Sequence, residues 1–265
     1  MSAQDDSLEI SAVRSAMVCD GIPVEIELLD VCESTNSALL DAPAAPPATL
    51  QVLACERQLA GRGRRGRSWL SWGKGSLTFS VRWQFPVGAA SPSGLSLAAG
   101  VAVARACEAV GARDVMLKWP NDVLSGGNKL GGILIELATS ASGATVAVIG
   151  IGLNLRRADA TALDVPVAAL EETMVVLPAR SRLLGELAGQ LARMLSVFSR
   201  EGFAAFRDEW QARNAHAGLP VQVTGDLGWS RSGVCLGADD DGALLLGSEL
   251  GRERVLSGDV SLRSA

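Results

Sequence analysis

The chain has 265 residues, a length that suits one large domain or a large domain followed by a small one. It is 48% hydrophobic and 20% charged, a balance typical of folded globular proteins, which excludes intrinsic disorder as its main state. The net charge of −5 argues against an extended nucleic-acid-binding surface, and no apolar run approaches the ~18 residues that a membrane helix needs.

The N-terminal part of the chain predicts a weak helix at Leu8–Cys19, followed by strands. The acidic opening MSAQDDSLEI has no apolar core and is not a signal peptide, so we expect a cytoplasmic protein. Ser34 has the side chain of an N-cap and opens a short helix before the Pro/Ala loop Ala42–Thr49. Alternating or continuous apolar runs predict strands at Val24–Val31, Leu50–Glu56 and Ser76–Phe85.

The rest of the chain predicts helices, a hairpin and a small β module. Ser93–Val110 is rich in Ala, Leu and Val on most faces, which predicts a well-buried helix. Apolar periodicity predicts a helix at Arg180–Arg200, and we expect a second helix, Glu201–Ala215, to pack beside it. We expect strands at Asp114–Lys118, Lys129–Thr139 and Thr145–Leu155, with a loop at Trp119–Asn128 and a turn at Ser140–Gly143. After Gly218, short strands alternate with turns, which predicts a small barrel of about 45 residues that leans on the larger domain.

The cysteines and the histidine give no sign of metal or thiol chemistry. The five cysteines are scattered without a CxxC pair, and His216 is the only histidine, so we expect neither a zinc site nor a Cys–His nucleophile. The odd number of cysteines fits free thiols in a reducing compartment. We expect His216 to be a helix-end residue without a catalytic role.

The segment QLAGRGRRGRSW, Gln58–Trp69, predicts an anion-binding site. Its glycines let backbone N–H groups approach an anion, and its arginines carry forked donors that match phosphate and carboxylate. No helical pattern and no GK[ST] follow, so it is neither a dinucleotide-binding fingerprint nor a P-loop. For this segment alone, a solvated basic loop or an RNA contact is an equal alternative.

Three other segments add polar groups next to apolar strands. KWPNDVL, Lys118–Leu124, presents Asn121 and Asp122 after a lysine, which suits phosphate neutralisation with a magnesium ion; alone, an ordinary Asn-Asp turn is favoured. KLGGILIE, Lys129–Glu136, starts an apolar strand with a lysine, and its glycines leave room for a ligand; a solvent-directed edge lysine is the alternative. GIGLN, Gly150–Asn154, ends a buried strand in one amide, which a strand terminus also explains.

The order and spacing of these segments resemble the bacterial biotin–protein ligases. The resemblance is carried by STN (34–36), ERQLAGRGRRGRSW (56–69), KWPNDV (118–123), KLGGILIE (129–136), GIGLN (150–154) and DVSLRS (259–264). It implies an α/β (α+β) catalytic domain related to class II aminoacyl-tRNA synthetases at residues 22–217. An SH3-like β-barrel would follow at 218–265, and residues 1–21 would form an N-terminal extension.

The resemblance also implies an activity and its partners. Biotin and ATP would form biotinyl-5′-AMP and pyrophosphate, and biotin would then pass to one lysine of the biotin carboxyl carrier protein of acetyl-CoA carboxylase. Mg²⁺ would be held mainly by the ATP phosphates. We expect no membrane and no DNA as partner, and the family includes monomers and homodimers.

The implied site residues fall into three groups. Those assigned to biotin are Ser34, Thr35, Asn36, Gln58, Gly61, Arg62, Gly63, Arg64, Lys129 and Gly132. Those assigned to ATP are Arg64, Arg67, Trp69, Lys118, Asn121, Lys129 and Asn154. Arg64, Lys118 and Lys129 would offset the repulsion between carboxylate and α-phosphate. Asp122 would orient the carrier lysine or accept its proton.

The chain departs from the family pattern at two places. Some members carry an N-terminal winged helix-turn-helix; no such pattern precedes the core here, so we expect a monofunctional enzyme. Val165, Pro166 and Val167 lie where some members place a tryptophan that stacks on the adenylate.

The nearest alternative is a lipoate- or octanoate-protein ligase of the same fold. Its members lack the GRGRRG loop in this form, and the polar set Ser34–Asn36 with Gln58 argues against an aliphatic-only ligand. An RNA-binding module is the other alternative. It would need interleaved aromatics and a basic surface, but the chain has no tyrosine.

Overall fold

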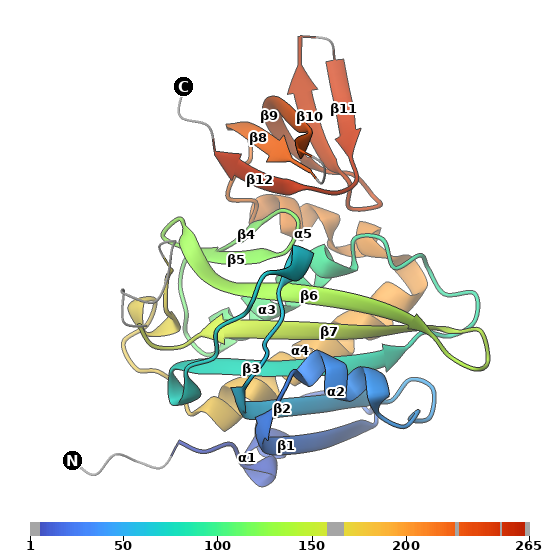
Figure 1. Ribbon diagram of the computed structural model, residues 1–265, viewed down its shortest axis with the longest axis vertical. Coiled ribbons are helices and arrows are strands. Elements are labelled where there is room, and N and C mark those ends of the chain that lie inside the picture. The colour runs from blue at the N-terminus through green and yellow to red at the C-terminus, as the bar shows by residue number, and fades with distance from the viewer. Residues whose placement is uncertain (1–5, 158–166, 226–227, 250, 263–265) are drawn as a thin grey trace.

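A seven-stranded mixed sheet is the centre of the molecule. The computed structural model describes residues 6–157, 167–225, 228–249 and 251–262. The strand order is β1-β2-β3-β7-β6-β5-β4, with β1 and β2 parallel and every other neighbouring pair antiparallel (Figure 1). The strands are β1 Val24–Cys32, β2 Leu50–Gln58, β3 Ser76–Gln84, β4 Val115–Lys118, β5 Asp122–Ser125, β6 Asn128–Thr139 and β7 Thr145–Asn154. The predicted α/β class is confirmed.

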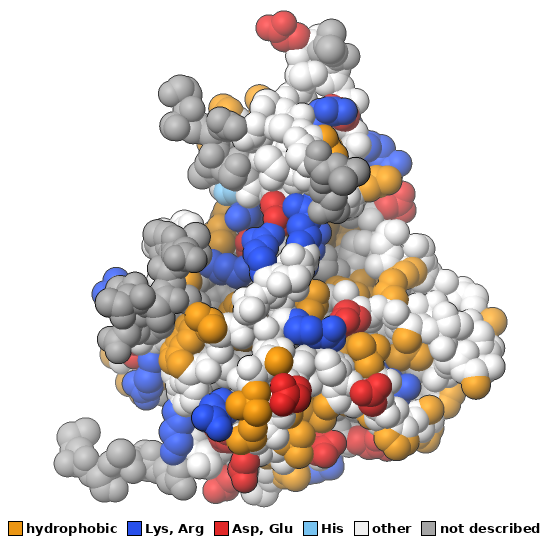
Figure 2. Space-filling model, in the orientation of Figure 1, with side chains coloured by type: hydrophobic (Ala, Val, Ile, Leu, Met, Phe, Trp, Pro, Cys, Tyr) orange, Lys and Arg blue, Asp and Glu red, His pale blue; other side chains and the backbone are white. Residues whose placement is uncertain are grey.

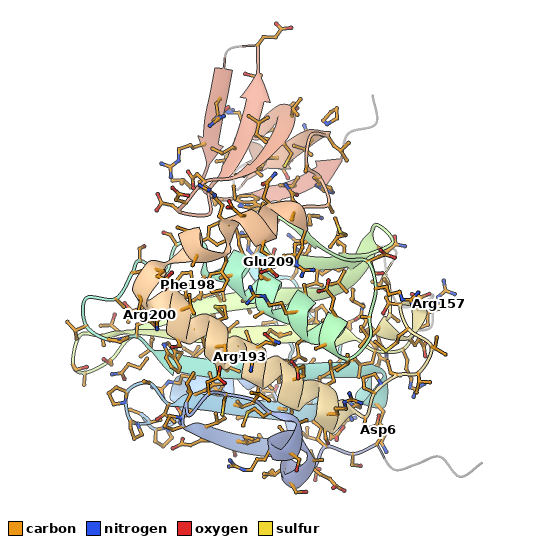
Figure 3. All side chains as sticks on the ribbon, turned by 180° about the vertical axis from the view of Figure 1, so that it is seen from behind. Asp6, Arg157, Arg193, Phe198, Arg200 and Glu209 are labelled. Carbon is orange, nitrogen blue, oxygen red and sulfur yellow. The ribbon has the colours of Figure 1, made fainter. Side chains whose placement is uncertain are left out.

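Helices cover both faces of this sheet. The short α2 (Thr35–Asp41) lies on the front face, and α3 (Leu95–Ala109) and α4 (Arg180–Glu201) lie across the back (Figures 1 and 3). Most residues of α3 are buried, because it packs between the sheet and α4. The front face is only partly covered by α2, which leaves room for the segment between β2 and β3 to cross it.

The N-terminal segment packs into the hydrophobic core beside α4. Its helix α1 (Ile10–Ala16) packs along α4, and Val13 is fully buried. Gly185 and Gly189 form a notch on α4 where the backbone of this segment approaches closely: a Cβ on Gly189 would lie 2.6 Å from the Val18 carbonyl oxygen. The predicted helix at Leu8–Cys19 is therefore present, shortened at both ends.

The structure corrects two predicted elements. The loop expected at Trp119–Asn128 contains β5, whose four residues are stabilised because β4 and β6 pair with it on both sides. The helix expected at Glu201–Ala215 is divided, because Gly202 at φ 66° ends α4. A 3₁₀ turn at Phe203–Phe206 and the short α5 (Arg207–Ala212) follow.

A second sheet, stacked on α5, forms the C-terminal part (Figure 1). Its antiparallel order is β11-β10-β9-β8-β12. The strands are β8 Pro220–Thr224, β9 Ser230–Ala238, β10 Leu244–Ser248, β11 Gly251–Val255 and β12 Asp259–Leu262. The predicted small β module is confirmed. Among the described residues its end strands β11 and β12 do not pair, so the expected barrel is an open sheet. No helix in the described chain is long and apolar enough to cross a membrane.

Candidate active site

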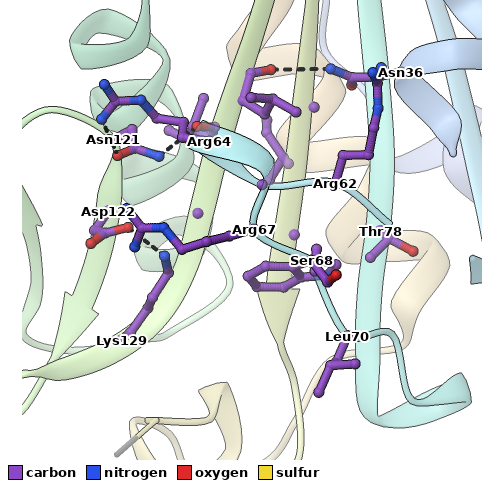
Figure 4. Close-up of a pocket in the computed structure, with 18 of the residues that line it drawn as sticks. Asn36, Arg62, Arg64, Arg67, Ser68, Leu70, Thr78, Asn121, Asp122 and Lys129 are labelled. Atoms are coloured by element: carbon purple, nitrogen blue, oxygen red, sulfur yellow. Dashed lines mark hydrogen bonds and ion pairs between the residues drawn. The ribbon is translucent and has the colours of Figure 1, made fainter. Parts of the chain in front are cut away.

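A cavity of about 550 Å³ lies on the front face of the large sheet, beneath the segment that follows β2. Side chains from the two sheets, from α2 and from this segment line it (Figure 4). It brings together nearly all the predicted site residues: Ser34, Thr35, Asn36, Gln58, Arg62, Gly63, Arg64, Arg67, Trp69, Lys118, Asn121, Asp122, Lys129, Gly132 and Asn154.

Gly61 is the predicted site residue that does not line the cavity. The Trp69 N–H donates to the Gly61 carbonyl (2.8 Å), and a Cβ on Gly61 would overlap the Trp69 carbonyl oxygen. The missing side chain therefore lets two arms of the loop come together, which is a structural role for this glycine.

Residues 61–69 form a small hairpin over the cavity, called the covering hairpin below. Arg62 and Ser68 form an antiparallel bridge, and the Gly63 N–H donates to the Arg67 carbonyl (2.6 Å). Arg65 and Gly66 turn the chain at its tip with φ of 55° and 71°. The Trp69 ring occupies the space where a Cβ of Gly152 on β7 would lie. The hairpin is thus seated on the sheet by an aromatic ring resting on a glycine.

One end of the cavity is polar and carries little charge. The Ser34 hydroxyl caps α2 by accepting from the Ser37 N–H at 3.5 Å. The Gln58 side-chain oxygen accepts from the Thr35 N–H (2.8 Å) and hydroxyl (3.1 Å). The buried Asn36 amide accepts from the Ser80 hydroxyl (2.6 Å). Buried polar groups are costly unless they are paired, so this network holds the cluster in one arrangement.

The other end is cationic, with one carboxylate between two lysines. Lys129 Nζ lies 2.6 Å from one Asp122 oxygen (Figure 4). Lys118 Nζ lies 3.3 Å from the other. Strand register explains this arrangement, because Lys118 on β4 lies opposite Asp122 on β5. Arg64 donates to the Asn121 side-chain oxygen (3.2 Å), and burial lowers the pKa of its guanidinium. Phosphate or carboxylate groups would be stabilised at this end.

Asn154 and Val167 contact the backbone of Lys129. The Asn154 amide donates to the carbonyls of Lys129 (3.2 Å) and Ala168 (3.1 Å), and Val167 bridges to Lys129 and lines the cavity. Of the residues expected in place of a stacking tryptophan, Val165 and Pro166 lie outside the described residues. Val167 is aliphatic and cannot stack on a base as an indole would.

Three residues that motif analysis did not assign are part of the site's framework. Asp259 on β12 lines the cavity and pairs with three arginines of the covering hairpin: Arg64 (3.5 Å), Arg65 (3.2 Å) and Arg67. Figure 2 shows the basic cluster at the junction of the two sheets. Glu136 and Ser80 hold Asn36 from two sides. Asp259 and Glu136 stand at the ends of the motifs DVSLRS and KLGGILIE, whereas Ser80 had no local signal.

His216 lies near the cationic end of the cavity, close enough to Lys118 to be affected by its charge. His216 follows α5 within a turn rather than ending the helix, and it is buried. Burial and the positive charge of Lys118 lower its pKa. Within the described ranges, no group of three or more His, Cys, Asp or Glu side chains is arranged to hold a metal ion.

Comparison with known proteins agrees with this geometry. Residues 28–154 match the model of the biotin/lipoate A/B protein ligase family. Over 91% of its length the chain is 35% identical to the bifunctional ligase/repressor BirA of Escherichia coli, covering 74% of that protein. Over 86% of its length it is 37% identical to the biotin–[acetyl-CoA-carboxylase] ligase of Paracoccus denitrificans, covering 96% of it.

Among solved structures, the biotin protein ligase of Aquifex aeolicus in complex with biotin and ATP is similar. It superposes with a TM-score of 0.78 at 28% identity, over 91% of this chain and 99% of that one. The resemblance seen in the motifs is therefore confirmed, and the chain belongs to the biotin protein ligases of the biotin/lipoate A/B protein ligase family.

Proposed function

We propose that this enzyme joins biotin to ATP, forming biotinyl-5′-AMP and pyrophosphate, and then transfers biotin to a lysine of the biotin carboxyl carrier protein of acetyl-CoA carboxylase. The observation that carries the proposal is the polarity of the cavity. One end offers a fixed set of uncharged polar groups, and the other offers lysines and arginines. Such a cavity suits a ligand with a neutral polar head and an anionic tail.

The ureido head of biotin fits the neutral end. Ser34, Thr35 and Gln58 present hydroxyl and amide groups there, and the Gln58 oxygen is already engaged by Thr35. Its amide N–H groups are the part of Gln58 that a ligand carbonyl would use. Arg62, Gly63 and Gly132 would complete the biotin site, Gly132 by leaving space against the strand.

The anionic groups would meet at the cationic end. A carboxylate attacks the α-phosphate of ATP, and both reactants are negatively charged. Arg64, Lys118 and Lys129 lie where they would offset this repulsion and stabilise the charge that spreads over the phosphoryl oxygens. We assign the nucleotide to Arg67, Trp69, Asn121 and Asn154 as well. Because both Asn154 amide protons are bound to backbone, its contact would be through its oxygen or through Lys129.

Mg²⁺ would enter with the nucleotide. Both oxygens of Asp122 already hold lysine ammonium groups, so this carboxylate is occupied as a cation partner. The ATP phosphates are then the main ligands, and Mg²⁺ would supply further neutralisation of their charge.

The second step needs a neutral lysine amine on the carrier. We assign the carboxylate of Asp122, at the cationic end where the mixed anhydride would form, to orient this amine or accept its proton once a phosphate has taken over one of its two lysine partners. The covering hairpin would keep water from the anhydride until the carrier arrives.

The test is incubation of the full chain with biotin, MgATP and a biotin carboxyl carrier domain, followed by mass spectrometry of the carrier. We expect biotin on one lysine and release of pyrophosphate, both absent when biotin is omitted. Lipoate and octanoate serve as competing acids. Modification of the carrier lysine by lipoate but not by biotin would contradict the assignment and favour the lipoate ligases of the same fold.

A further inference from the structure

Glu136 has a position at the rim of the cavity that the reaction above does not use. Alternate residues of β6 point to the same side of the sheet, so Gly132, Leu134 and Glu136 share a face. The first two line the cavity, and Glu136 continues this row beyond its neutral end. Its side chain is only 26% exposed, although it carries a charge.

One oxygen of Glu136 joins two segments that are far apart in the sequence. Glu136 Oε2 accepts from Arg62 Nη2 of the covering hairpin (2.7 Å) and from Asn36 Nδ2 of α2 (2.8 Å). A single carboxylate oxygen thus connects the hairpin above the cavity to the polar cluster inside it. Hydrogen bonds to an ionised group are shorter and stronger than neutral ones, so the charge of Glu136 matters to both contacts.

The side chain of Asn36 is fixed by hydrogen bonds in the orientation that lets it donate to Glu136. Its second amide proton points to the Leu134 carbonyl (3.4 Å), its oxygen accepts from Ser80, and the Gly150 backbone packs against that oxygen. Both of its amide protons are therefore used within the protein. The structure assigns Asn36 to fixing Glu136 rather than to donating a hydrogen bond to the ligand.

We propose that Glu136 is a positioning residue that holds the covering hairpin closed through Arg62 and links this closure to the biotin end of the cavity through Asn36. The arginines at the hairpin tip are bound to Asp259 at the cationic end, so Glu136 controls the opposite end. Loss of its charge would loosen the base of the hairpin and leave the nucleotide contacts in place. The inference rests on the proposed function for the identity of the ligand, but not for the behaviour of the hairpin.

The experiment uses Glu136→Gln, Arg62→Gln and the double variant. Hydrogen–deuterium exchange of residues 61–69 is measured in the ligand-free protein, and release of preformed biotinyl-AMP is measured by rapid filtration. Because the pair is partly exposed, we expect each single variant to release the adenylate about three- to tenfold faster, with KM for ATP unchanged. Exchange of the hairpin should rise in parallel. The double variant should be no worse than the worse single variant, since both remove the same interaction.

Two controls make the result specific. Glu136→Asp keeps the charge and should restore part of the adenylate retention. Glu253→Gln breaks a comparable ion pair with Arg231 (3.1 Å) in the C-terminal sheet and should change neither measurement. Unchanged hairpin exchange in Glu136→Gln, or multiplying effects in the double variant, would overturn the proposal. If the wild-type chain forms no adenylate, the proposed function fails, while the exchange measurement still decides the role of Glu136.

Discussion

Lys118 and Lys129 are held side by side by one carboxylate, and this arrangement explains how two ammonium groups stay together in a half-buried cavity. Each oxygen of Asp122 engages one of them, so their mutual repulsion is reduced before any phosphate arrives. The lysines are therefore already directed into the cavity, and little reorganisation is needed when charge develops in the reaction. Of the two, Lys129 lies closer to Asp122 and is supported from below by Asn154 and Val167.

Replacement of Lys129 tests this view of the cationic end. We expect Lys129→Met to lower the rate of pyrophosphate release about 10²–10³-fold, the range seen when one charge-stabilising donor is removed from other enzymes. The folded structure should persist, because a half-exposed side chain of similar length remains. Lys74→Met, which changes an exposed lysine outside the cavity, is the matched control. A Lys129→Met enzyme that releases pyrophosphate at the wild-type rate would show that the lysine has no role in activation.

His216 predicts a specific dependence of stability on pH. Burial and Lys118 lower its pKa in the folded protein below the ordinary value of 6.5, so the unfolded chain binds the proton more readily. Its contribution to stability is therefore complete above pH 6.5 and is lost as pH falls through 6.5 toward the lowered pKa. His216 is the only histidine, and carboxyl groups titrate mainly at lower pH, so this window is nearly its own.

The measurement is Tm of wild type and His216→Gln at pH 7.5 and at pH 5.5. The wild-type Tm should fall between these values, and the variant should fall less, because glutamine does not titrate. An equal decrease in both proteins would show that other groups cause the pH dependence. Pyrophosphate release at pH 7.5 serves as the control that the variant is folded.

The types of side chain in the site could be predicted from the sequence, but their partners could not. Glycine and arginine spacing indicated an anion-binding loop, although not its hairpin form, and the lysines were found because they stand at strand ends. Ser80 looked like any small residue of a buried strand, and only the register of β3 against β7 and the position of α2 bring it to Asn36. Gly61 stays a prediction as a ligand residue; the structure gives it a role in close backbone approach, and such a glycine looks the same in sequence as one needed for a ligand.

At the scale of elements, the glycine notch on α4 predicts how a Gly→Ala substitution changes the free energy of unfolding. The atoms next to each glycine decide whether the change is a loss or a gain. Exchanging glycine for alanine inside a helix normally gains about 1 kcal/mol. A Cβ on Gly189 would lie 2.6 Å from the Val18 carbonyl oxygen, a backbone atom that cannot turn away. We therefore expect Gly189→Ala to lower the free energy of unfolding by about 1–3 kcal/mol, measured by urea denaturation.

Gly100 on α3 provides the contrast. A Cβ there would meet the methyl groups of Leu117 at 3.3 and 3.5 Å, and side-chain ends can move by a few tenths of an ångström. Gly100→Ala should therefore change stability little or increase it. If Gly189→Ala were as stable as Gly100→Ala, the N-terminal segment would not depend on the notch.

The long elements could be predicted from the sequence, whereas the short strand β5 and the break after α4 could not. α3 is apolar on most faces and α4 carries apolar residues at helical spacing, so the positions of both long helices were found within a few residues. β5 has only four residues, begins with a turn-forming Asp, and exists because two neighbours pair with it. A helix was expected over Glu201–Ala215, but Gly202 at positive φ ended α4 there. In both cases the deciding interactions are tertiary.

At the scale of the whole molecule, the covering hairpin lies between the two sheets and is bound to both. Trp69 seats it on β7, and Asp259 at the start of β12 attracts three of its arginines. The C-terminal sheet therefore contributes directly to the cavity, although it carries no other charged residue among those that line it in the described chain. Without Asp259, the three guanidinium groups would repel one another across the nucleotide end.

Asp259→Asn tests whether the two sheets act together. We expect KM for ATP to rise about three- to tenfold, because the arginines would no longer be preorganised, while binding of biotin alone changes little at the distant neutral end. Higher ionic strength should weaken ATP binding by the wild type in the same direction, since these side chains are partly exposed and their charges are screened. Asp240→Asn is the matched control. Asp240 lies in the turn between β9 and β10, is an exposed partner of Arg207, and its replacement should leave KM for ATP unchanged. If Asp259→Asn instead bound ATP more tightly, the Asp259 carboxylate would compete with the ATP phosphates for the arginines rather than orient these side chains. The C-terminal sheet would then weaken ATP binding instead of contributing to it.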